Sequence, residues 1–452
     1  MASATMIRDM TEGPVVPQLF RFALPLFASN ALQAIYNIVD MVIVGNYIGA
    51  TGMSAVSIGG DILHLLTFVA MGFSSAGQVI IARAVGARQH DQIRRTIGTM
   101  FTFLLSAAAV IAGVCYLLRY SVLDWLNTPR ASAAFAMDYM VTCVCGLVFI
   151  YGYNIVSAIL RGMGDSRRPF MFIAIAAILN TVLDILFVKY CGMEVFGAAL
   201  ATVIGQGVSF VLAILYLYRR RESFGFDFRP ASFRIDGGAF RQLLALGIPM
   251  AIQSAAISFS KIILMAWINL FDVTYSALAG IFNKVNVVSG VISMSFTTAG
   301  STMAGQNLAA GRHSRVNRIL ATVLAVGMGL AGVFTLVMLL WPDGVYRAFT
   351  PDAAVLSAAG VLTLPIILNF YGSATRSAAF SLINGSGRPK LNLAIALIDG
   401  VIARIGLAAL LGFAMRLDCF GFWLGDALAG FMPLVIGGTF YLSGRWKEGA
   451  PE

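Results

Sequence analysis

The sequence predicts an all-α polytopic membrane protein. Of its 452 residues, 59% are hydrophobic and only 12% are charged, and the mean hydropathy is +0.83. Soluble domains carry about 25% charged residues, whereas a membrane-spanning helix needs about 20 largely apolar residues. Long apolar segments recur along the whole chain. These observations predict twelve transmembrane helices, arranged in two six-helix lobes.

The first half begins with a polar tail, residues 1–16, which we expect to be cytoplasmic, and continues as an N-lobe over 17–219. No cleavable signal is predicted, because the first apolar segment is too long and no small-residue cleavage motif follows it. Glycine-rich loops separate the first span from the second and the fourth from the fifth. Glycine suits such tight loops, because it adopts positive φ without strain. The six spans are predicted over 17–44, 53–84, 94–118, 133–160, 168–189 and 196–219.

The second half follows a charged linker, residues 220–239, which we expect to be cytoplasmic. The C-lobe is predicted over 240–443, and a cytoplasmic tail, 444–452, ends the chain. Its six spans are predicted over 240–270, 275–308, 317–341, 354–383, 390–414 and 419–443.

The two halves repeat each other in sequence. The stretch Leu-Phe-Arg-Phe-Ala-Leu-Pro-Leu-Phe around Pro25 matches Leu-Leu-Ala-Leu-Gly-Ile-Pro-Met-Ala around Pro249, an offset of 224 residues. Gly86 likewise meets Gly311 at an offset of 225. Because six spans is an even number, both lobes face the same way. We therefore expect a parallel pseudo-two-fold repeat, in which binding sites lie near the membrane midplane.

The positive charge, +10 in total, is unevenly placed along the chain. Most of the 31 Lys and Arg residues fall in the tails and in alternate loops, which is the positive-inside pattern. It predicts a multi-pass protein of the cytoplasmic (inner) membrane with both termini in the cytoplasm, surrounded by membrane lipid and binding no nucleic acid. Five cations fall on the opposite side (Arg119, Arg130, Lys189, Arg347, Arg416), and four within spans (Lys261, Lys284, Arg376, Arg404).

No enzymatic constellation is visible in the sequence. There is no P-loop lysine motif, so ATP is not the expected energy source. The three histidines share no metal-ligand spacing, and the five cysteines indicate neither a metal site nor a disulfide framework. We expect a non-enzyme that uses no cofactor.

Acids inside the first half point to a functional site, because an acid in the hydrocarbon region is costly. Asn180 and Asp184 are four residues apart in the fifth span, so they share one helix face. An amide beside a carboxylate offers oxygen ligands to a hard cation, or a hydrogen-bonded place for a proton. Two alternatives are a carboxyl that stays protonated and an interfacial ion pair between Asp184 and Lys189.

The first span carries a polar stripe on an otherwise apolar helix. Gln33, Tyr36, Asn37 and Asp40 follow the i, i+3, i+4, i+7 spacing of one helical face. Such a stripe faces a cavity or another helix rather than lipid. Pro25 lies upstream and removes a backbone hydrogen bond, so it can bend this helix. The alternative is that the amides only hold neighbouring helices together.

The second half lacks the matching acids. The positions that correspond to Asp40 and Asp184 lie near Leu264 and Arg404. Asp399 could neutralise a nearby cation, and charge pairs that fix helix packing are the favoured interpretation here. A substrate-facing role for Lys261 or Arg376 is the alternative. The polar candidates in this half are Gln253, Lys261, Arg376, Asp399 and Arg404.

Several short stretches together resemble the multidrug and toxic compound extrusion (MATE) family over nearly the whole chain. They are 25–45, 86–88, 160–165, 180–184 and 305–311. The resemblance implies two six-helix lobes around a central V-shaped cavity, and export of organic compounds in exchange for H⁺ or Na⁺.

The resemblance also assigns roles to individual residues. It implies an N-lobe cation site, possible for Na⁺ as well as H⁺, at Asp40, Asn180, Asp184 and Thr202. It places Tyr36 and Asn154 among the neighbouring polar residues and Pro25 at a helix bend. Some family members carry a carboxylate on the seventh helix, where this chain has Gln253 and Lys261 instead. A C-lobe sodium site of that type is therefore not expected.

The sequence as a whole predicts a cation-coupled antiporter that works by alternating access. We expect it to export small organic, often cationic or amphipathic compounds and to function as a monomer. The substrate cavity is predicted to include Gln33, Tyr36, Asn37 and Asn154. Two alternatives are a lipid-linked oligosaccharide flippase of a related fold and a non-transporting membrane receptor or scaffold.

Overall fold

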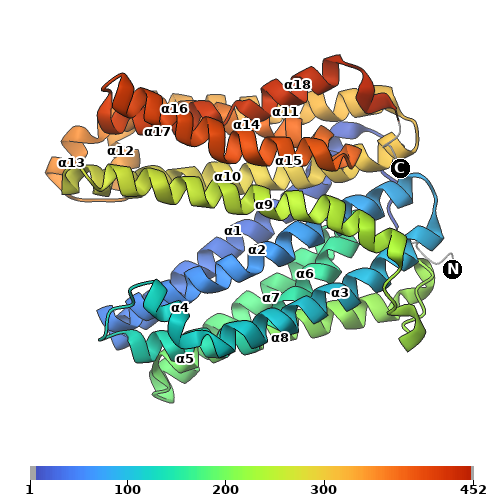
Figure 1. Cartoon of the computed structure of the whole chain (residues 1–452), viewed down its shortest axis with the longest axis horizontal. Coiled ribbons are helices and arrows are strands. Elements are labelled where there is room, and N and C mark those ends of the chain that lie inside the picture. The colour runs from blue at the N-terminus through green and yellow to red at the C-terminus, as the bar shows by residue number, and fades with distance from the viewer. Residues whose placement is uncertain (1–6, 449–452) are drawn as a thin grey trace. The chain divides into compact units, whose positions relative to one another are not determined.

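The computed structural model describes residues 7–448, and within them every regular element is a helix. Eleven helical segments are long and apolar enough to cross a membrane, and a bent pair of helices makes a twelfth. The predicted all-α fold with twelve spans is confirmed (Figure 1).

In chain order, the spans of the first half are α1 (Val15–Ile48), α2 (Ala50–Gly86), α3 (His90–Leu117), α5 with α6 (Ala133–Cys145, Leu147–Gly162), α7 with a π-helical end (Arg167–Asp184, Ile185–Tyr190) and α8 (Glu194–Arg219). Those of the second half are α9 (Gly237–Ile268), α10 (Val273–Ala309), α11 (His313–Leu340), α13 with α14 (Ala353–Ala358, Thr363–Ser386), α15 with α16 (Pro389–Leu397, Arg404–Ala409) and α17 with α18 (Asp418–Ala429, Met432–Leu442). Two short helices, α4 (Arg119–Trp125) and α12 (Pro342–Arg347), lie between spans.

The fourth span differs from its prediction as one helix over 133–160. It consists of α5 and α6, which meet at Gly146 with a bend of 46°. A Cβ atom on Gly146 would come within 2.6 Å of the Val203 side chain on α8. The glycine therefore lets the bent span approach α8 closely.

π-Helical segments interrupt the fifth and eleventh spans. Ile185–Tyr190 ends the fifth span, and Leu410–Ala414 ends the eleventh. The two segments occupy nearly equivalent positions in the two halves. A second π-helical segment, Ile398–Ala403, lies only in the eleventh span. Single π-helical turns often occur at functional sites, because the extra residue re-aims the side chains beside it.

The described residues form two units. Residues 7–9 and 24–247 belong to the first unit, and residues 10–23 and 248–448 to the second. One boundary, between residues 9 and 10, precedes α1, and the other two fall inside α1 and α9, each within two residues of an internal proline, Pro25 or Pro249. In α1 the Ser29 hydroxyl donates a hydrogen bond to the carbonyl of Pro25 at 2.8 Å. Back-bonding of this kind commonly accompanies a bent helix.

In the first unit, the charged linker is fixed to the start of α3. The backbone N–H of Asp236 donates to the Thr99 hydroxyl at 3.0 Å, and the Asp236 carboxylate lies 3.6 Å from Arg95. Earlier in the linker, hydrogen bonds from the Ser232 hydroxyl and the Arg229 N–H hold the pKa of Asp227 below its usual range. The linker is thus an ordered part of this unit.

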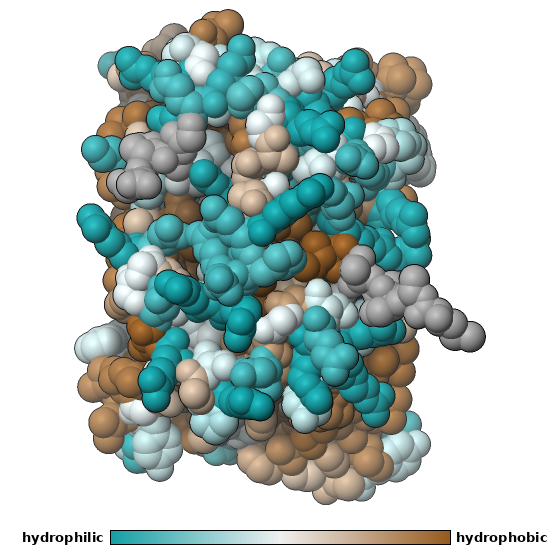
Figure 2. Space-filling view, turned by 90° about the vertical axis from the view of Figure 1, so that its right-hand side faces the viewer, coloured by the Kyte–Doolittle hydropathy of each residue, from teal (hydrophilic) through white to brown (hydrophobic). Residues whose placement is uncertain are grey.

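Hydrophilic side chains gather on the face that Figure 2 shows. Apolar side chains cover the sides of the helices instead. The α11 span is an example, since only 17% of its most apolar window is buried by protein. Exposed apolar helix sides beneath a charged end are typical of a protein surrounded by lipid.

Candidate functional site

Two buried carboxyl groups define the candidate site in the first unit. Asp40 on α1 is 6% exposed, and Asp184 at the end of α7 is 0% exposed. The two carboxyls interact electrostatically, so they lie close together. Lys189 extends away over the rings of Tyr47 and Tyr190, and within residues 7–448 no ion pair joins it to Asp184. An interfacial Asp184–Lys189 pair is therefore absent from this arrangement.

Asn180 and Thr202 lie beside these carboxyls. The Asn180 amide donates a hydrogen bond to the Thr202 hydroxyl at 3.4 Å, which connects α7 to α8. In the described part of the chain, Asp40 Oδ1, Asn180 Oδ1 and both carboxylate oxygens of Asp184 are buried without a hydrogen-bond partner. Buried polar atoms in proteins nearly always have partners, so each such exception calls for an explanation. Four buried oxygen atoms without donors fit a place that takes up a proton or a hard cation.

A narrow cavity beside Asn180 adds Gln206 to the site, and a contact of Thr202 adds Tyr139. Tyr36, Thr202 and Gln206 line this cavity, and Tyr36 is within hydrogen-bonding reach of Gln206. Tyr139 on α5 is buried and within hydrogen-bonding reach of Thr202. Gln206 lies four residues after Thr202 on α8, so the two side chains share one helix face, and this spacing could have connected Gln206 to the site. Tyr139 reaches the site only through the packing of α5 against α8.

The other predicted cavity residues are less closely tied to the acids. Gln33 is partly buried and Asn37 is exposed, both on α1, and neither lines the cavity beside Asn180. Asn154 donates its side-chain amide to the carbonyl of Ile150, one turn earlier on α6, at 2.8 Å. Their contact with a substrate remains a prediction.

The second unit holds a cluster in which buried acids are paired with arginines. Arg404 is 1% exposed and lies between Asp399, at 3.3 Å, and Asp426. Arg376 also contacts the Asp399 carboxylate at 3.1 Å. The sequence did not single out Asp426, because its partner lies 22 residues earlier on another helix. This paired arrangement agrees with a role in fixing helix packing.

Two further predicted residues of the second unit lie on α9. Lys261 is exposed and interacts electrostatically with Asp426 and Asp399, but no carboxylate among residues 7–448 lies within ion-pair distance of it. Gln253 is 9% exposed, and its Nε2 has no partner in the same part of the chain. Within residues 7–448, no group of three or more His, Cys, Asp or Glu side chains is placed to hold a metal ion.

The register of the repeat can be followed through the fifth and sixth spans of each half. Glu194 begins α8 and Asp418 begins α17, at the offset of 224 residues that separates Pro25 from Pro249. Both residues have a positive φ of 50°. Because a positive φ is uncommon outside glycine, its recurrence at equivalent positions supports this register.

In this register, the two polar arrangements occupy equivalent positions. Arg404 corresponds to Asn180 and Asp426 corresponds to Thr202, so the ion pair of one repeat replaces the hydrogen bond of the other. Asp184 corresponds to Ala408, one turn beyond the Arg404 position, and Asp40 corresponds to Leu264. The second repeat therefore has an internal cation where the first has unpaired oxygen atoms.

Comparisons with known proteins agree with this repeat. The MatE family model matches the chain twice, over residues 25–186 and 249–410. Among curated relatives, the probable multidrug resistance protein YpnP of Bacillus subtilis is 27% identical over 97% of both chains. The probable multidrug resistance protein NorM of Thermotoga maritima is 23% identical, over 96% of this chain and 93% of its own.

Solved structures show the same fold. A crystal structure described as MATE in the bent conformation aligns with a TM-score of 0.88 over 98% of both chains, at 19% identity. A transporter of the MOP superfamily from Pyrococcus furiosus, described as having a binding pocket of reversed polarity, aligns with a TM-score of 0.85 at 18% identity. Because the family model covers most of the sequence in two matching copies, this chain belongs to the MatE family of multi-pass membrane transporters.

Proposed function

We propose that this protein is a cation-coupled antiporter, driven by H⁺ or Na⁺, that exports organic compounds across the cytoplasmic membrane. The names of its relatives as multidrug resistance proteins support small organic substrates, and the family resemblance implies that these are often cationic or amphipathic. The positive-inside pattern supports a cytoplasmic location for both termini. No cofactor other than the coupling ion is required, and a single chain contains the whole proposed site.

One observation carries the proposal, namely the difference between the buried acids of the two repeats. Asp399 and Asp426 are each paired with an arginine, whereas no Lys or Arg among residues 7–448 forms an ion pair with Asp40 or Asp184. A buried carboxylate without a counter-charge is costly, so its charge must be neutralised from outside. A proton or Na⁺ supplied from the extracellular side would do this, and its later release would complete a coupled cycle.

The geometry supports a specific order of events. In the outward-facing state, the carboxyls of Asp40 and Asp184 take up the cation, which removes their mutual repulsion. The packing of α1 then changes around Pro25, substrate leaves, and the inward-facing state releases the cation. Coupling requires the cation and the substrate to favour different states or to compete for one site. Asp40 is suited to this role, because it lies on the same helix as Pro25.

Dye efflux from everted membrane vesicles tests this function. A pH gradient and a sodium gradient are imposed separately, and we expect one of them to drive efflux in the wild type. Asp40→Asn should abolish the driven efflux, whereas Asp91→Asn, which alters an exposed acid on α3, should leave it unchanged. Efflux at the wild-type rate in Asp40→Asn would contradict the assignment, and flux that needs neither gradient would contradict antiport altogether.

A lipid-linked oligosaccharide flippase is the second candidate. The cluster of Lys261, Arg376 and Arg404 with Asp399 and Asp426 has one more cation than anions, which favours an anionic group such as a pyrophosphate. The test measures translocation of a fluorescent lipid-linked pyrophosphate in proteoliposomes. Translocation that is lost in Lys261→Gln and does not depend on either ion gradient would favour this candidate over the antiporter. A receptor or scaffold would show neither flux.

A further inference from the structure

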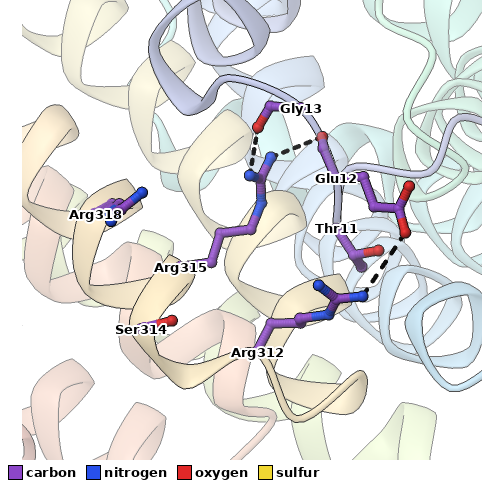
Figure 3. A pocket seen from close by; sticks show the side chains of 7 residues that line it. All are labelled: Thr11, Glu12, Gly13, Arg312, Ser314, Arg315 and Arg318. Atoms are coloured by element: carbon purple, nitrogen blue, oxygen red, sulfur yellow. Dashed lines mark hydrogen bonds and ion pairs between the residues drawn. The ribbon is translucent and has the colours of Figure 1, made fainter.

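A cavity of about 320 Å³ lies at the start of α11 in the second unit (Figure 3). One wall is the N-terminal segment 11–13, and the other is the first two turns of α11 with the residue before them. Its lining residues are Thr11, Glu12, Gly13, Arg312, Ser314, Arg315 and Arg318. Three arginines against one glutamate make it strongly basic.

Two of these arginines hold the N-terminal segment in place. The Arg315 guanidinium donates to the carbonyls of Glu12 at 2.9 Å and Gly13 at 2.5 Å (Figure 3). It also donates to the Gln18 side chain at 2.7 Å. Arg312 lies 3.7 Å from the Glu12 carboxylate. The wall formed by 11–13 is therefore an ordered part of the cavity.

Two polar side chains of the cavity, Arg318 and Ser314, have no hydrogen-bond or ion-pair partner among the described residues. Both are exposed. They are four residues apart, so they share one face of α11. No side chain caps the N-terminus of α11 at Arg312. Among residues 7–448, the backbone N–H groups of His313 and Arg315 donate to the carbonyls of Gly311 and Arg312, which leaves the N–H of Ser314 open to an acceptor. All of these groups favour an anion.

The position of the cavity along α11 places it at the membrane surface. The 22 residues from Ile319 to Leu340 rise about 33 Å, close to the thickness of the hydrocarbon core of about 30 Å. Arg318 directly precedes this apolar segment and therefore lies at the depth of the lipid headgroups. Because most of the α11 span is not covered by protein, lipid can reach the cavity from its side.

We propose that this cavity binds the phosphate of an anionic glycerophospholipid from the cytoplasmic leaflet. Guanidinium groups match phosphate oxygens in geometry and charge, and helix N-termini bind phosphate through their free N–H groups. Basic pockets on the cytoplasmic side of membrane proteins commonly hold such headgroups. The bound phosphate would lie beside Arg312 and Arg315 and would offset part of the positive charge of this wall. A free phosphate shares this chemistry, but the depth of Arg318 favours the lipid.

Native mass spectrometry of the purified full chain tests the site. The protein in detergent is mixed with equal amounts of phosphatidylglycerol and phosphatidylcholine, and we expect the wild type to retain one phosphatidylglycerol preferentially. Arg318→Gln should weaken this first adduct about fivefold, the effect of about 1 kcal/mol for one arginine near an anionic membrane. Adding Ser314→Ala to Arg318→Gln should weaken the phosphatidylglycerol adduct further.

The first repeat provides a matched control. Arg94 on α3 corresponds to Arg318 at the offset of 224 residues, but it lies 3.8 Å from Asp91. Arg94→Gln makes the same change in surface charge, and we expect it to leave the first adduct unchanged. Because the Arg318 side chain has no partner among residues 7–448, Arg318→Gln should unfold at the wild-type temperature in detergent with phosphatidylcholine alone.

Three outcomes would overturn the proposal. The first is an unchanged adduct in Arg318→Gln. The second is an equal loss in Arg94→Gln, which would reduce the effect to general surface charge. The third is displacement of phosphatidylglycerol by millimolar inorganic phosphate, which would identify a free phosphate as the ligand in place of a lipid.

Discussion

Arg404 stands in the second repeat where Asn180 stands in the first, and each donates to the side chain 22 residues further along. The acceptor is Thr202 in the first repeat and Asp426 in the second. A guanidinium is a permanent cation, so the second repeat contains its own counter-charge at this position. The repeat thus holds two versions of one helix contact, and only one of them is left open to an external cation.

Replacing Arg404 should therefore destabilise the protein strongly. Arg404→Gln leaves Asp426 without its cation and Asp399 with only Arg376. Removing one member of a buried ion pair typically costs about 3–5 kcal/mol. We expect a loss of that size in the free energy of unfolding, measured by denaturant titration in mixed micelles.

The double variant Arg404→Gln with Asp426→Asn separates charge from packing. It removes the unpaired carboxylate that the single variant leaves behind, so more than half of the lost stability should return. Adding Asp426→Asn to Arg404→Gln could instead lower the free energy of unfolding by as much as Asp426→Asn lowers it in the wild type. That result would show that the two residues are not energetically coupled.

Unlike Arg404→Gln, Asp184→Asn should leave the stability of the protein almost unchanged. Neither oxygen of the Asp184 carboxylate has a partner within residues 7–448, so replacing it removes a buried charge without breaking a bond. We expect the free energy of unfolding to stay within about 1 kcal/mol of the wild type or to rise, while driven efflux is lost. The stability is measured as above and the efflux in everted vesicles. A loss of stability as large as that of Arg404→Gln would point to a structural role instead.

The hydrogen bond between Asn180 and Thr202 should contribute to cation affinity. Thr202→Val keeps the shape of the side chain but removes the acceptor that orients the Asn180 amide. A hydrogen bond contributes about 0.5–1.5 kcal/mol, so the cation concentration for half-maximal efflux should rise about two- to tenfold.

Thr181→Val is the matched control for Thr202→Val. Thr181 neighbours Asn180 on α7, but its hydroxyl donates to the Ala177 carbonyl of its own helix at 3.0 Å. The half-maximal cation concentration should therefore stay at the wild-type value. An equal rise in both variants would show that any threonine hydroxyl in this region matters, and that the contact with Asn180 is not special.

Much of the fold could be predicted because the bilayer imposes it. The hydrocarbon core requires apolar segments of a certain length, so the twelve spans are visible in composition alone. The acids of the first repeat were also visible, because Asn180 and Asp184 lie four residues apart on one helix and an acid in this setting is rare. Local spacing and the cost of burial carried both predictions.

Features that depend on contacts distant in sequence could not be predicted. Asp426 lies among apolar residues of the twelfth span, and only the packing of α17 against α16 brings it to Arg404. The break at Gly146 depends on its contact with Val203 of another span. Similarly, nothing in the polar segment 10–13 indicates that it is held by Arg315, since it has no helical or strand periodicity.

The contact between α16 and α17 gives a last prediction, which concerns Gly425. A Cβ atom at this position would press on the backbone of Ala408 and lie 2.7 Å from the carbonyl carbon of Leu407. Backbone atoms cannot move aside as a flexible side chain can, so α17 would have to shift. Small residues allow membrane helices to approach in this way.

Gly425→Ala should therefore lower the free energy of unfolding by about 1–3 kcal/mol, as overpacking does elsewhere. Because Asp426 is the next residue, the shift would also weaken its ion pair with Arg404, and the effects of Gly425→Ala and Arg404→Gln should be less than additive. Gly406→Ala on α16 is the control, since no atom outside its own helix turn lies within 4 Å of the new Cβ. Alanine should stabilise that position by up to about 1 kcal/mol. Equal effects of the two alanines would mean that helix propensity, and not the close approach of α17 to α16, decides the stability of this contact.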